Sequence, residues 1–202
     1  MFGTLRKICF VAALAAGLSL GLAARAGEEG FVSLFDGKDL SGWKIVPENA
    51  KGTFTVKGGE IVVSGKPNGY FYSDKSYKNY ILRFDWKFIK DGNSGLLVHI
   101  TGAHKVWPKC VEVQGMQKDH GRIFAIGGAK GKFDVDKKAQ EKAIKIGDWN
   151  TTEVICKDGE ITSKINGVQI STGKGELTEG PFGFQSEGTE LHFKNIRIKE
   201  LK

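Results

Sequence analysis

Residues 79–90 read NYILRFDWKFIK, and this stretch decides the fold class. Aromatic and aliphatic side chains recur at every second position, and charged side chains occupy positions between them. Alternation with a period of two predicts a long β-strand with one buried face and one face in water. The apolar positions are Tyr80, Leu82, Phe84, Trp86 and Phe88, and the charged positions are Arg83, Asp85 and Lys87.

Tight turns between short β-rich segments extend this prediction to the rest of the chain. Gly58-Gly59, Asp158-Gly159 and Asn166-Gly167 each separate two such segments. These dipeptides favour the positive backbone angles that two-residue β-hairpins need. The chain contains 28 Gly and only 4 Pro. Turns that recur every roughly 8 to 12 residues are typical of a sandwich, so we expect an all-β fold of two antiparallel sheets.

Two local departures from regular strands are expected. The segment from Val135 to Ile146 is the only convincing helix candidate, and we predict a short surface helix or an ordered loop that could act as a lid. Near the C-terminus, Leu191 and Phe193 have one parity whereas Ile196 and Ile198 have the other. A regular strand cannot bury all four side chains on one face, so we predict a β-bulge near Lys194-Asn195.

The N-terminus has the pattern of an export signal. Arg6 and Lys7 precede an apolar run, and Ala24-Arg25-Ala26 ends it with the small-x-small pattern that signal peptidases cleave. The run, residues 8–23, is shorter than the roughly 20 residues that a membrane-spanning helix needs, which disfavours an anchor. We therefore expect a signal peptide over residues 1–26, one domain over residues 27–202, a periplasmic or secreted location, and no membrane association after cleavage.

Charge and cysteine content narrow the function classes. The formal net charge is +7, and it falls to +4 without residues 1–26 because three basic and no acidic residues lie there. The remaining Lys residues are interspersed with Asp and Glu, so nucleic acid is not an expected partner. Cys110 and Cys156 remain in the mature chain. An exporting compartment permits a disulfide, but the spacing does not require one, so a bridge and two buried free thiols both stay open.

The candidate site begins with residues 93–114, NSGLLVHITGAHKVWPKCVEVQ. Carboxylate, imidazole and amide side chains are grouped there on two strand candidates and the loop between them, as in sites that bind sugars. Glu112 and Gln114 share one side of their strand, while Val111 and Val113 face the other side, which we expect to be the core. The chain has no G-x-S-x-G elbow, P-loop or dinucleotide fingerprint, so serine hydrolase, nucleotide and NAD functions lack support.

Several motifs, taken together, resemble one known family. The segment from Leu34 to Trp43 matches the pattern LFDG-x-x-L-x-G-W of the DUF1080 family, also called the 3-keto-disaccharide hydrolase domain. The remaining matches follow in the family's order: Asn93-Ser94-Gly95, Glu112-Val113-Gln114, Trp149-Asn150, Asn166-Gly167, Gly183-Phe184-Gln185 and Phe193-Lys194-Asn195-Ile196. The resemblance implies a concanavalin A-like jelly roll with a ligand groove on its concave sheet. It also implies an exported carbohydrate-active protein that cleaves glycosides oxidised at carbon 3.

The implied chemistry assigns roles to these residues. A ketone at carbon 3 acidifies the proton on carbon 2, so a base can remove it while an acid protonates the leaving glycosidic oxygen. We expect Glu112 as the acid/base group with His99 or His104 as its partner. The predicted substrate contacts are Asn93, Gln114, Trp107, Asp119, His120, Gln185 and Glu187.

Alternatives remain for each of these assignments. Glu112 is read equally well as a solvated carboxylate, His99 as a structural histidine, and His104 and His120 as solvated side chains. No cofactor is required, but a divalent metal held by the histidines with Glu112 or Asp119 is conceivable. The chain also lacks the paired carboxylates of ordinary retaining glycosidases at this strand.

The chain departs from the family pattern at two places, and this leaves other function classes open. His99 stands where many relatives have Arg, and residues 122–126 (RIFAI) replace a common G-A-I-Y. The rival function is a non-catalytic module that holds glycan. A third is a structural or partner-binding sandwich.

Overall fold

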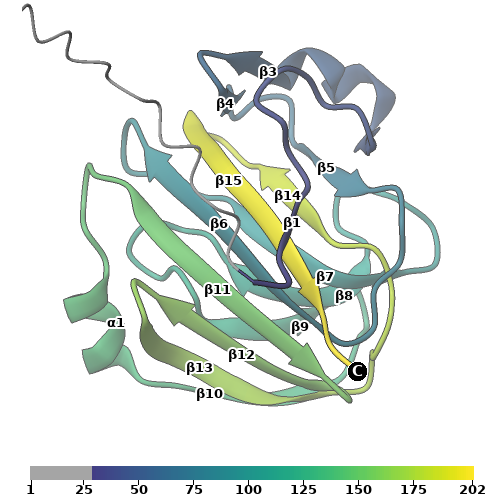
Figure 1. Ribbon diagram of the computed structural model, residues 1–202, viewed down its shortest axis with the longest axis vertical. Coiled ribbons are helices and arrows are strands. Elements are labelled where there is room, and N and C mark those ends of the chain that lie inside the picture. Colours follow the sequence, from purple (N-terminus) through teal and green to yellow (C-terminus); the bar gives the residue numbers. More distant parts are fainter. Residues whose placement is uncertain (1–28) are drawn as a thin grey trace, which may run out of the picture.

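The protein is described by a computed structural model that covers residues 29–202, and the predicted signal peptide over residues 1–26 lies outside this range. Two antiparallel sheets pack face to face (Figure 1). The larger sheet has the order β10 (Gly131–Val135), β13 (Val168–Gly175), β12 (Glu160–Ile165), β11 (Asn150–Lys157), β6 (Tyr80–Phe88), β15 (Leu191–Glu200), β4 (Glu60–Val63) and β3 (Phe54–Lys57), and β1 (Val32–Ser33) pairs with β15. The smaller sheet has the order β2 (Trp43–Val46), β5 (Gly69–Ser73), β14 (Gly183–Ser186), β7 (Gly95–Thr101), β8 (Lys109–Gln114) and β9 (Ile123–Ile126).

Strand β6 runs through the middle of the larger sheet and confirms the predicted alternation. Tyr80 and every second residue after it, up to Phe88, are buried, and the residues between them are partly exposed. Its apolar face packs against apolar residues of the smaller sheet, including Phe71, Phe184 and Val113. Burial of these aromatic side chains between the layers is the main source of stability in a fold of this kind.

The predicted turns and the predicted bulge are all present. Hairpins join β3 to β4, β11 to β12 and β12 to β13 at the three expected dipeptides. In β15, the register against β6 shifts between Lys194 and Arg197, and Asn195 has a φ of 52°. The left-handed residue reverses the parity of the strand, so Phe193 and Ile196 are both buried.

Helices are few and short. A 3-10 helix η1 covers Glu48–Thr53, and α1 covers Lys137–Ala143 within the predicted helix segment. Asp136 caps α1 by accepting a hydrogen bond from the backbone nitrogen of Ala139 (2.9 Å). α1 packs against β13, which places this segment beside the larger sheet rather than over the outer side of the smaller one. No helix within residues 29–202 is long and apolar enough to cross a membrane.

The two cysteines of the described range are free thiols. Cys110 lies in β8 of the smaller sheet and Cys156 in β11 of the larger sheet, and both side chains are fully buried. Burial raises the pKa of the Cys156 thiol to about 12. The disulfide that the sequence left open is therefore not formed in this structure.

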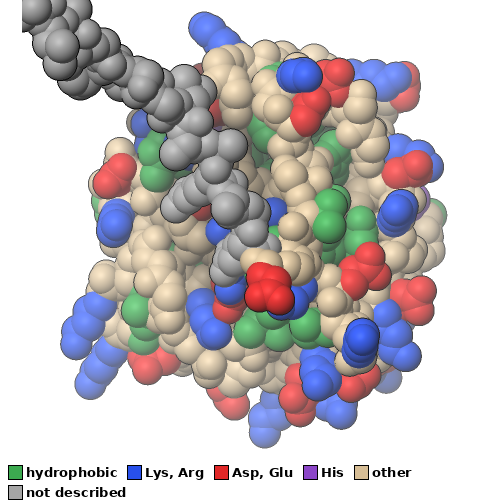
Figure 2. All heavy atoms as spheres, in the orientation of Figure 1, with side chains coloured by type: hydrophobic (Ala, Val, Ile, Leu, Met, Phe, Trp, Pro, Cys, Tyr) green, Lys and Arg blue, Asp and Glu red, His purple; other side chains and the backbone are tan. Residues whose placement is uncertain are grey.

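Charged side chains on the face of the molecule shown in Figure 2 are mixed in sign. Lys and Arg side chains alternate with Asp and Glu side chains over the strands of the larger sheet. The ion pairs Arg83–Glu153 (2.5 Å) and Lys164–Glu153 (3.0 Å) are examples from this sheet. The interspersed pattern agrees with the one expected from the sequence.

Candidate functional site

The outer face of the smaller sheet, turned away from the larger sheet, carries the candidate site. Strand alternation sends Leu96 and Val113 into the main core between the sheets. Residues of the opposite parity, Leu97 and Cys110, form a separate buried cluster with Tyr70 and Ile100 on the outer face. Glu112 and Gln114 have the parity of Cys110, so they share this outer face. The prediction that these two side chains point together and away from the core is confirmed.

Glu112 lies at the centre of this face. It pairs with Leu97 on β7 and with Phe124 on β9. Only 5% of its surface is exposed, so it is not a solvated carboxylate. A glycine, Gly95, stands on β7 beside it. A Cβ atom at this position would lie 2.6 Å from Glu112 Oε1 and 2.1 Å from Gln185 Oε1. The absence of a side chain at Gly95 therefore lets Glu112 and Gln185 reach the same point from two different strands.

Burial changes the protonation of Glu112. Desolvation, with a further contribution from the negative charge of Glu187, raises the pKa of Glu112 to about 7, and the positive charge of Arg122 opposes this rise. A carboxyl with this pKa is divided between its protonated and ionised forms at neutral pH. It can therefore either accept or donate a proton under physiological conditions.

Amide side chains surround Glu112 and leave acceptors unused. Asn93 forms isolated bridges with Glu187 and Gly188, and its side chain hydrogen-bonds the Glu187 carboxylate. Burial raises the pKa of Glu187 despite that hydrogen bond. The oxygens Asn93 Oδ1 and Gln185 Oε1 are buried without a hydrogen-bond partner. Unpaired buried acceptors are costly, so these two oxygens are available to a hydrogen-bond donor that enters the cluster.

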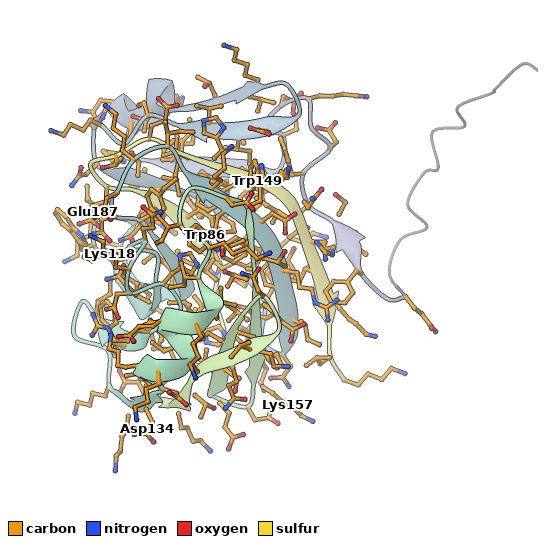
Figure 3. All side chains as sticks on the ribbon, turned by 90° about the vertical axis from the view of Figure 1, so that its left-hand side faces the viewer. Trp86, Lys118, Asp134, Trp149, Lys157 and Glu187 are labelled. Atoms are coloured by element: carbon orange, nitrogen blue, oxygen red, sulfur yellow. The ribbon has the colours of Figure 1, made fainter. Side chains whose placement is uncertain are left out.

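Other predicted contacts at this site have defined positions. Gln114 Oε1 accepts a hydrogen bond from the backbone nitrogen of Met116 (2.8 Å), which fixes the amide in place. Glu187 lies at the margin of the molecule on the side of the smaller sheet, while Trp86 lies between the layers (Figure 3). Glu112, Gln185, Asn93 and Glu187, drawn from three separate segments of the sequence, thus form one cluster.

Arg122 is a member of this cluster that the sequence analysis did not select. Its guanidinium carbon lies 4.7 Å from the centroid of the Phe124 ring, and its Nε donates to Asp119 Oδ2 (2.5 Å). Its charge acts on the Glu112 carboxyl. One available signal was the position of Arg122 two residues before Phe124, because alternation places both on the outer face with Glu112.

His99 does not lie next to Glu112. Its φ of 53° interrupts the alternation of β7, and its Nδ1 donates to the Leu177 carbonyl oxygen (3.0 Å). Its ring packs edge-on against Tyr80, which belongs to the larger sheet, at a centroid distance of 5.9 Å. His99 therefore faces the interior between the layers, and burial lowers its pKa. The expected pairing of His99 with Glu112 is not found.

His104 lies on the outer face, but against aromatic residues rather than against Glu112. Its ring stacks on Tyr72 at a centroid distance of 4.3 Å and an angle of 20°, and its Nδ1 lies 3.1 Å from the Tyr70 hydroxyl oxygen. Desolvation and the nearby Lys44 lower its pKa, so the ring is neutral at neutral pH. Trp107, in the same loop, is 51% exposed. The Tyr72 and His104 rings thus form a stacked pair, and Tyr70 lies between this pair and the cluster because it pairs with Gln185 across β5 and β14.

His120 and Asp119 have structural roles. The His120 ring stacks on Trp86 at a centroid distance of 3.7 Å, and its Nε2 lies 3.0 Å from Thr152 Oγ1. Complete burial lowers the pKa of His120 to about 3, so it stays neutral. Asp119 accepts hydrogen bonds from Lys137 and Arg122. Burial alone would raise the pKa of Asp119, but the hydrogen bonds and charges of these two cations outweigh it and lower the pKa. Asp119 is linked to the site only through its ion pair with Arg122, and His120 makes no contact with the site.

The histidines and carboxyls named as conceivable metal ligands do not come together. Within residues 29–202, no group of three or more His, Cys, Asp or Glu side chains is arranged to hold a metal ion. His99 and His120 face the interior, on the opposite side of the smaller sheet from Glu112. The cluster consists of two carboxyls with raised pKa values, amides with unpaired oxygens and one guanidinium charge.

Comparison with known proteins relates the chain to a family. The model of the 3-keto-alpha-glucoside-1,2-lyase-like domain matches residues 30–199. A 3-keto-disaccharide hydrolase of Bacteroides thetaiotaomicron is 22% identical over 86% of this chain and 79% of its own length.

Solved structures agree on the fold. A protein of Parabacteroides distasonis that is provisionally classed as a glycosyl hydrolase is 25% identical, with a TM-score of 0.64 over 86% of this chain and 95% of its own. The carbohydrate-binding module CBM66 of Bacillus subtilis is 13% identical, with a TM-score of 0.56 over 79% of this chain and 96% of its own. The predicted jelly-roll sandwich is thereby confirmed.

Proposed function

Because the chain belongs to the family of 3-keto-alpha-glucoside-1,2-lyase-like domains, we propose that it cleaves glycosides whose sugar carries a ketone at carbon 3, with Glu112 as the proton-transfer group. The observation that carries this proposal is a buried carboxyl with a pKa of about 7 on the outer face of the smaller sheet. Structural carboxyls in this chain, such as Asp119 and Glu153, have lowered pKa values because cations pair with them. A carboxyl whose pKa is instead raised to near neutral pH is suited to acid/base chemistry.

The proposed reaction begins with removal of the proton on carbon 2. Glu112 in its ionised form accepts this proton, and the electron pair moves into an enolate whose charge rests on the oxygen of carbon 3. The Arg122 guanidinium supplies positive charge near this position. The glycosidic oxygen then leaves from carbon 1 and takes up the proton that Glu112 has accepted, which returns Glu112 to its ionised form. Addition of water to the resulting alkene completes net hydrolysis.

Amides position the sugar for this sequence. The unpaired oxygens of Asn93 and Gln185 accept hydrogen bonds from hydroxyl groups, and the fixed amide of Gln114 offers its remaining nitrogen donors. Hydrogen bonds that satisfy buried acceptors discriminate strongly against ligands that lack the matching hydroxyl. The amides therefore favour a sugar over an ordinary ketone.

The direct test compares two chromogenic substrates, a 3-keto-glucoside and its unoxidised parent. The purified protein is expected to release the chromophore from the keto compound alone. Glu112→Gln is expected to lower kcat by a factor of about 100 or more, because general acid/base catalysis contributes roughly 100- to 10,000-fold. Glu141→Gln, a control at an exposed position on α1, should retain the activity of the unchanged chain.

Two results would contradict the proposal. Equal release from the oxidised and the unoxidised compound would remove the role of the ketone. Full activity in Glu112→Gln, with Glu141→Gln also active, would remove the role of Glu112.

A glycan-binding function is the second candidate, and the stacked rings of Tyr72 and His104 with the exposed Trp107 support it. Aromatic surfaces of this kind bind the apolar faces of sugars. Calorimetric titration with unoxidised oligosaccharides separates the two functions. Binding that Trp107→Ala abolishes, without turnover of any keto compound, would favour the module.

We also propose that the protein acts outside the cytoplasm after cleavage behind Ala26. The basic start, the short apolar run and the Ala24-Arg25-Ala26 ending support this location. Mass spectrometry of protein recovered from the periplasm or the medium should give an N-terminus at Gly27. A full-length chain retained in the cytoplasm would refute it.

A further inference from the structure

A hollow lies at the open edge of the sandwich, where the last strand of each sheet is unpaired on one side. β9 ends the smaller sheet and β10 ends the larger one. The hollow has a volume of about 470 Å³. Its lining residues are Ile123, Phe124, Ala125, Ala129, Lys130, Gly131 and Phe133.

One residue, Phe124, belongs both to the lining of the hollow and to the surroundings of Glu112. Phe124 lines the hollow, and it is also the direct cross-strand partner of Glu112. Directly paired residues in antiparallel strands point to the same face of a sheet, and their Cβ atoms are about 5 Å apart. The distance from Glu112 to Phe124 is therefore about the width of one sugar ring. A ligand whose reacting bond lies over Glu112 can extend past Phe124 into the hollow.

Phe124 and Phe133 are held in place by their neighbours. The Arg122 guanidinium covers one part of the Phe124 ring, and Phe133 crosses Gly131 and Gly173 so closely that a Cβ atom on either would lie within 3 Å of its ring. Fixed aromatic rings lose little conformational freedom when a ligand binds, so they make efficient contacts.

The two sides of Glu112 differ in chemistry. Toward β14 lie the amides and the second carboxyl, represented by Gln185, Asn93 and Glu187. Toward β9 and β10, the side chains of the hollow are aromatic rings, Ile and Ala with Lys130 as their one hydrogen-bond donor, and backbone groups of the two strand edges add polar surface. The sugar therefore belongs on the amide side, and the group that leaves belongs on the apolar side.

We propose that this hollow is the subsite for the leaving group and that it accepts an aromatic or other flat apolar aglycone in preference to a second sugar. This inference rests on the proposed function, because it takes Glu112 as the position of the reacting bond. It adds a substrate class, namely 3-keto-glycosides of aromatic or apolar alcohols, and it names Phe124 as a specificity-determining residue.

The test compares 3-keto-glucosides that differ only beyond the leaving oxygen. The ethyl and 2-phenylethyl compounds both release a primary alcohol, so their intrinsic reactivities are close, and the matching 3-keto-disaccharide supplies a sugar as leaving group. We expect kcat/KM for the phenylethyl compound to exceed that of the other two by about tenfold or more, mainly through a lower KM.

Variants assign this preference to the hollow. Phe124→Ala and the filling substitution Ala129→Trp should each bring the ratio of phenylethyl to ethyl kcat/KM toward one. Val168→Ala, which shortens an exposed apolar side chain on β13, is the control and should leave the ratio unchanged.

The outcomes separate this inference from the proposed function. Turnover of all three compounds with equal kcat/KM, or with the disaccharide preferred, would overturn the aglycone inference alone. A preference for the phenylethyl compound that survives both Phe124→Ala and Ala129→Trp would also overturn it. Absence of turnover for every keto compound would instead refute the proposed function.

Discussion

Replacing Glu112 by Gln should stabilise the protein at alkaline pH, because the buried carboxyl that suits catalysis is a cost to folding. The pKa of Glu112 rises from its ordinary value of 4.5 to about 7 in the folded protein. Between these two values the folded state holds a proton that the unfolded chain has released. The free energy of unfolding therefore falls as the pH rises from about 4.5 to about 7.

The size of this cost follows from the pKa difference. Each pKa unit corresponds to about 1.4 kcal/mol, so complete ionisation of Glu112 costs about 3 kcal/mol above pH 7. Gln has the shape of the protonated acid and carries no charge. It also brings an amide donor close to Gln185 Oε1, which lacks a partner.

The assay is urea unfolding of the unchanged chain and the Glu112→Gln variant across a pH series. The variant should be more stable by about 3 kcal/mol at pH 8, and the difference should shrink toward zero near pH 4.5. A variant that is less stable at pH 8, or a difference that does not change with pH, would refute the reasoning.

Glu153→Gln is the matched control with the opposite sign. Glu153 ion-pairs with Arg83 and Lys164, and hydrogen bonds from these cations lower its pKa although burial opposes them. Its contribution to stability is present above the pKa of the unfolded chain and is lost as the pH falls through the lowered folded value. The same chemical substitution should therefore destabilise the protein at pH 8 and have little effect in strong acid.

Further predictions concern the pH profile, the site and the bulge. With Glu112 as the base, kcat/KM should rise with pH to a plateau above about 7. Because Glu187 raises the pKa of Glu112 and Arg122 lowers it, Glu187→Gln should move this rise to lower pH and Arg122→Gln should move it to higher pH. Profiles that do not move would contradict these charge assignments. Gly95→Ala places a Cβ atom 2.6 Å from the catalytic carboxylate, so kcat/KM should fall about tenfold or more while the circular dichroism spectrum stays unchanged; normal activity would show that this close approach is dispensable. Both Asn195→Gly and Asn195→Ala lose the hydrogen bond from Asn195 Nδ2 to Asp85 Oδ2 (2.6 Å), but Asn195→Ala should be less stable than Asn195→Gly by about 1 kcal/mol because φ is 52° at this position. Equal stabilities of the two variants, measured by thermal unfolding, would argue against a strained turn.

The sequence predicted the features of this fold that depend on a period of two. The alternation in β6, the three hairpin dipeptides and the parity change around Asn195 all follow from local geometry, and each is present. The orientation of Glu112 and Gln114 was predictable for the same reason. These predictions required only that neighbouring residues obey strand geometry.

The residues that form the site were harder to predict, because their positions depend on where the inward and outward alternation of strand side chains is interrupted. The positive φ of His99 turns its ring into the interior, so no count of parity along β7 could place it. His120 follows β8 in a turn, and its stacking on Trp86 depends on how that turn folds back between the sheets. Arg122 was missed because its relation to Glu112 arises from pairing between β8 and β9. The sequence signal at Gly95 was a glycine at the start of an apolar strand, which indicates a close approach without saying by which side chain.

Because Cys110 and Cys156 lie in different sheets, folding of the chain does not depend on the redox state of its surroundings. Within residues 29–202, no disulfide joins the two layers, so apart from the connecting loops their association depends on noncovalent packing of the core. Both thiols are buried, and burial raises the pKa of each, which leaves almost no thiolate to react with oxidants or with other chains. Oxidising and reducing surroundings should therefore give the same native protein, and material produced in a reducing cytoplasm should match exported material in stability.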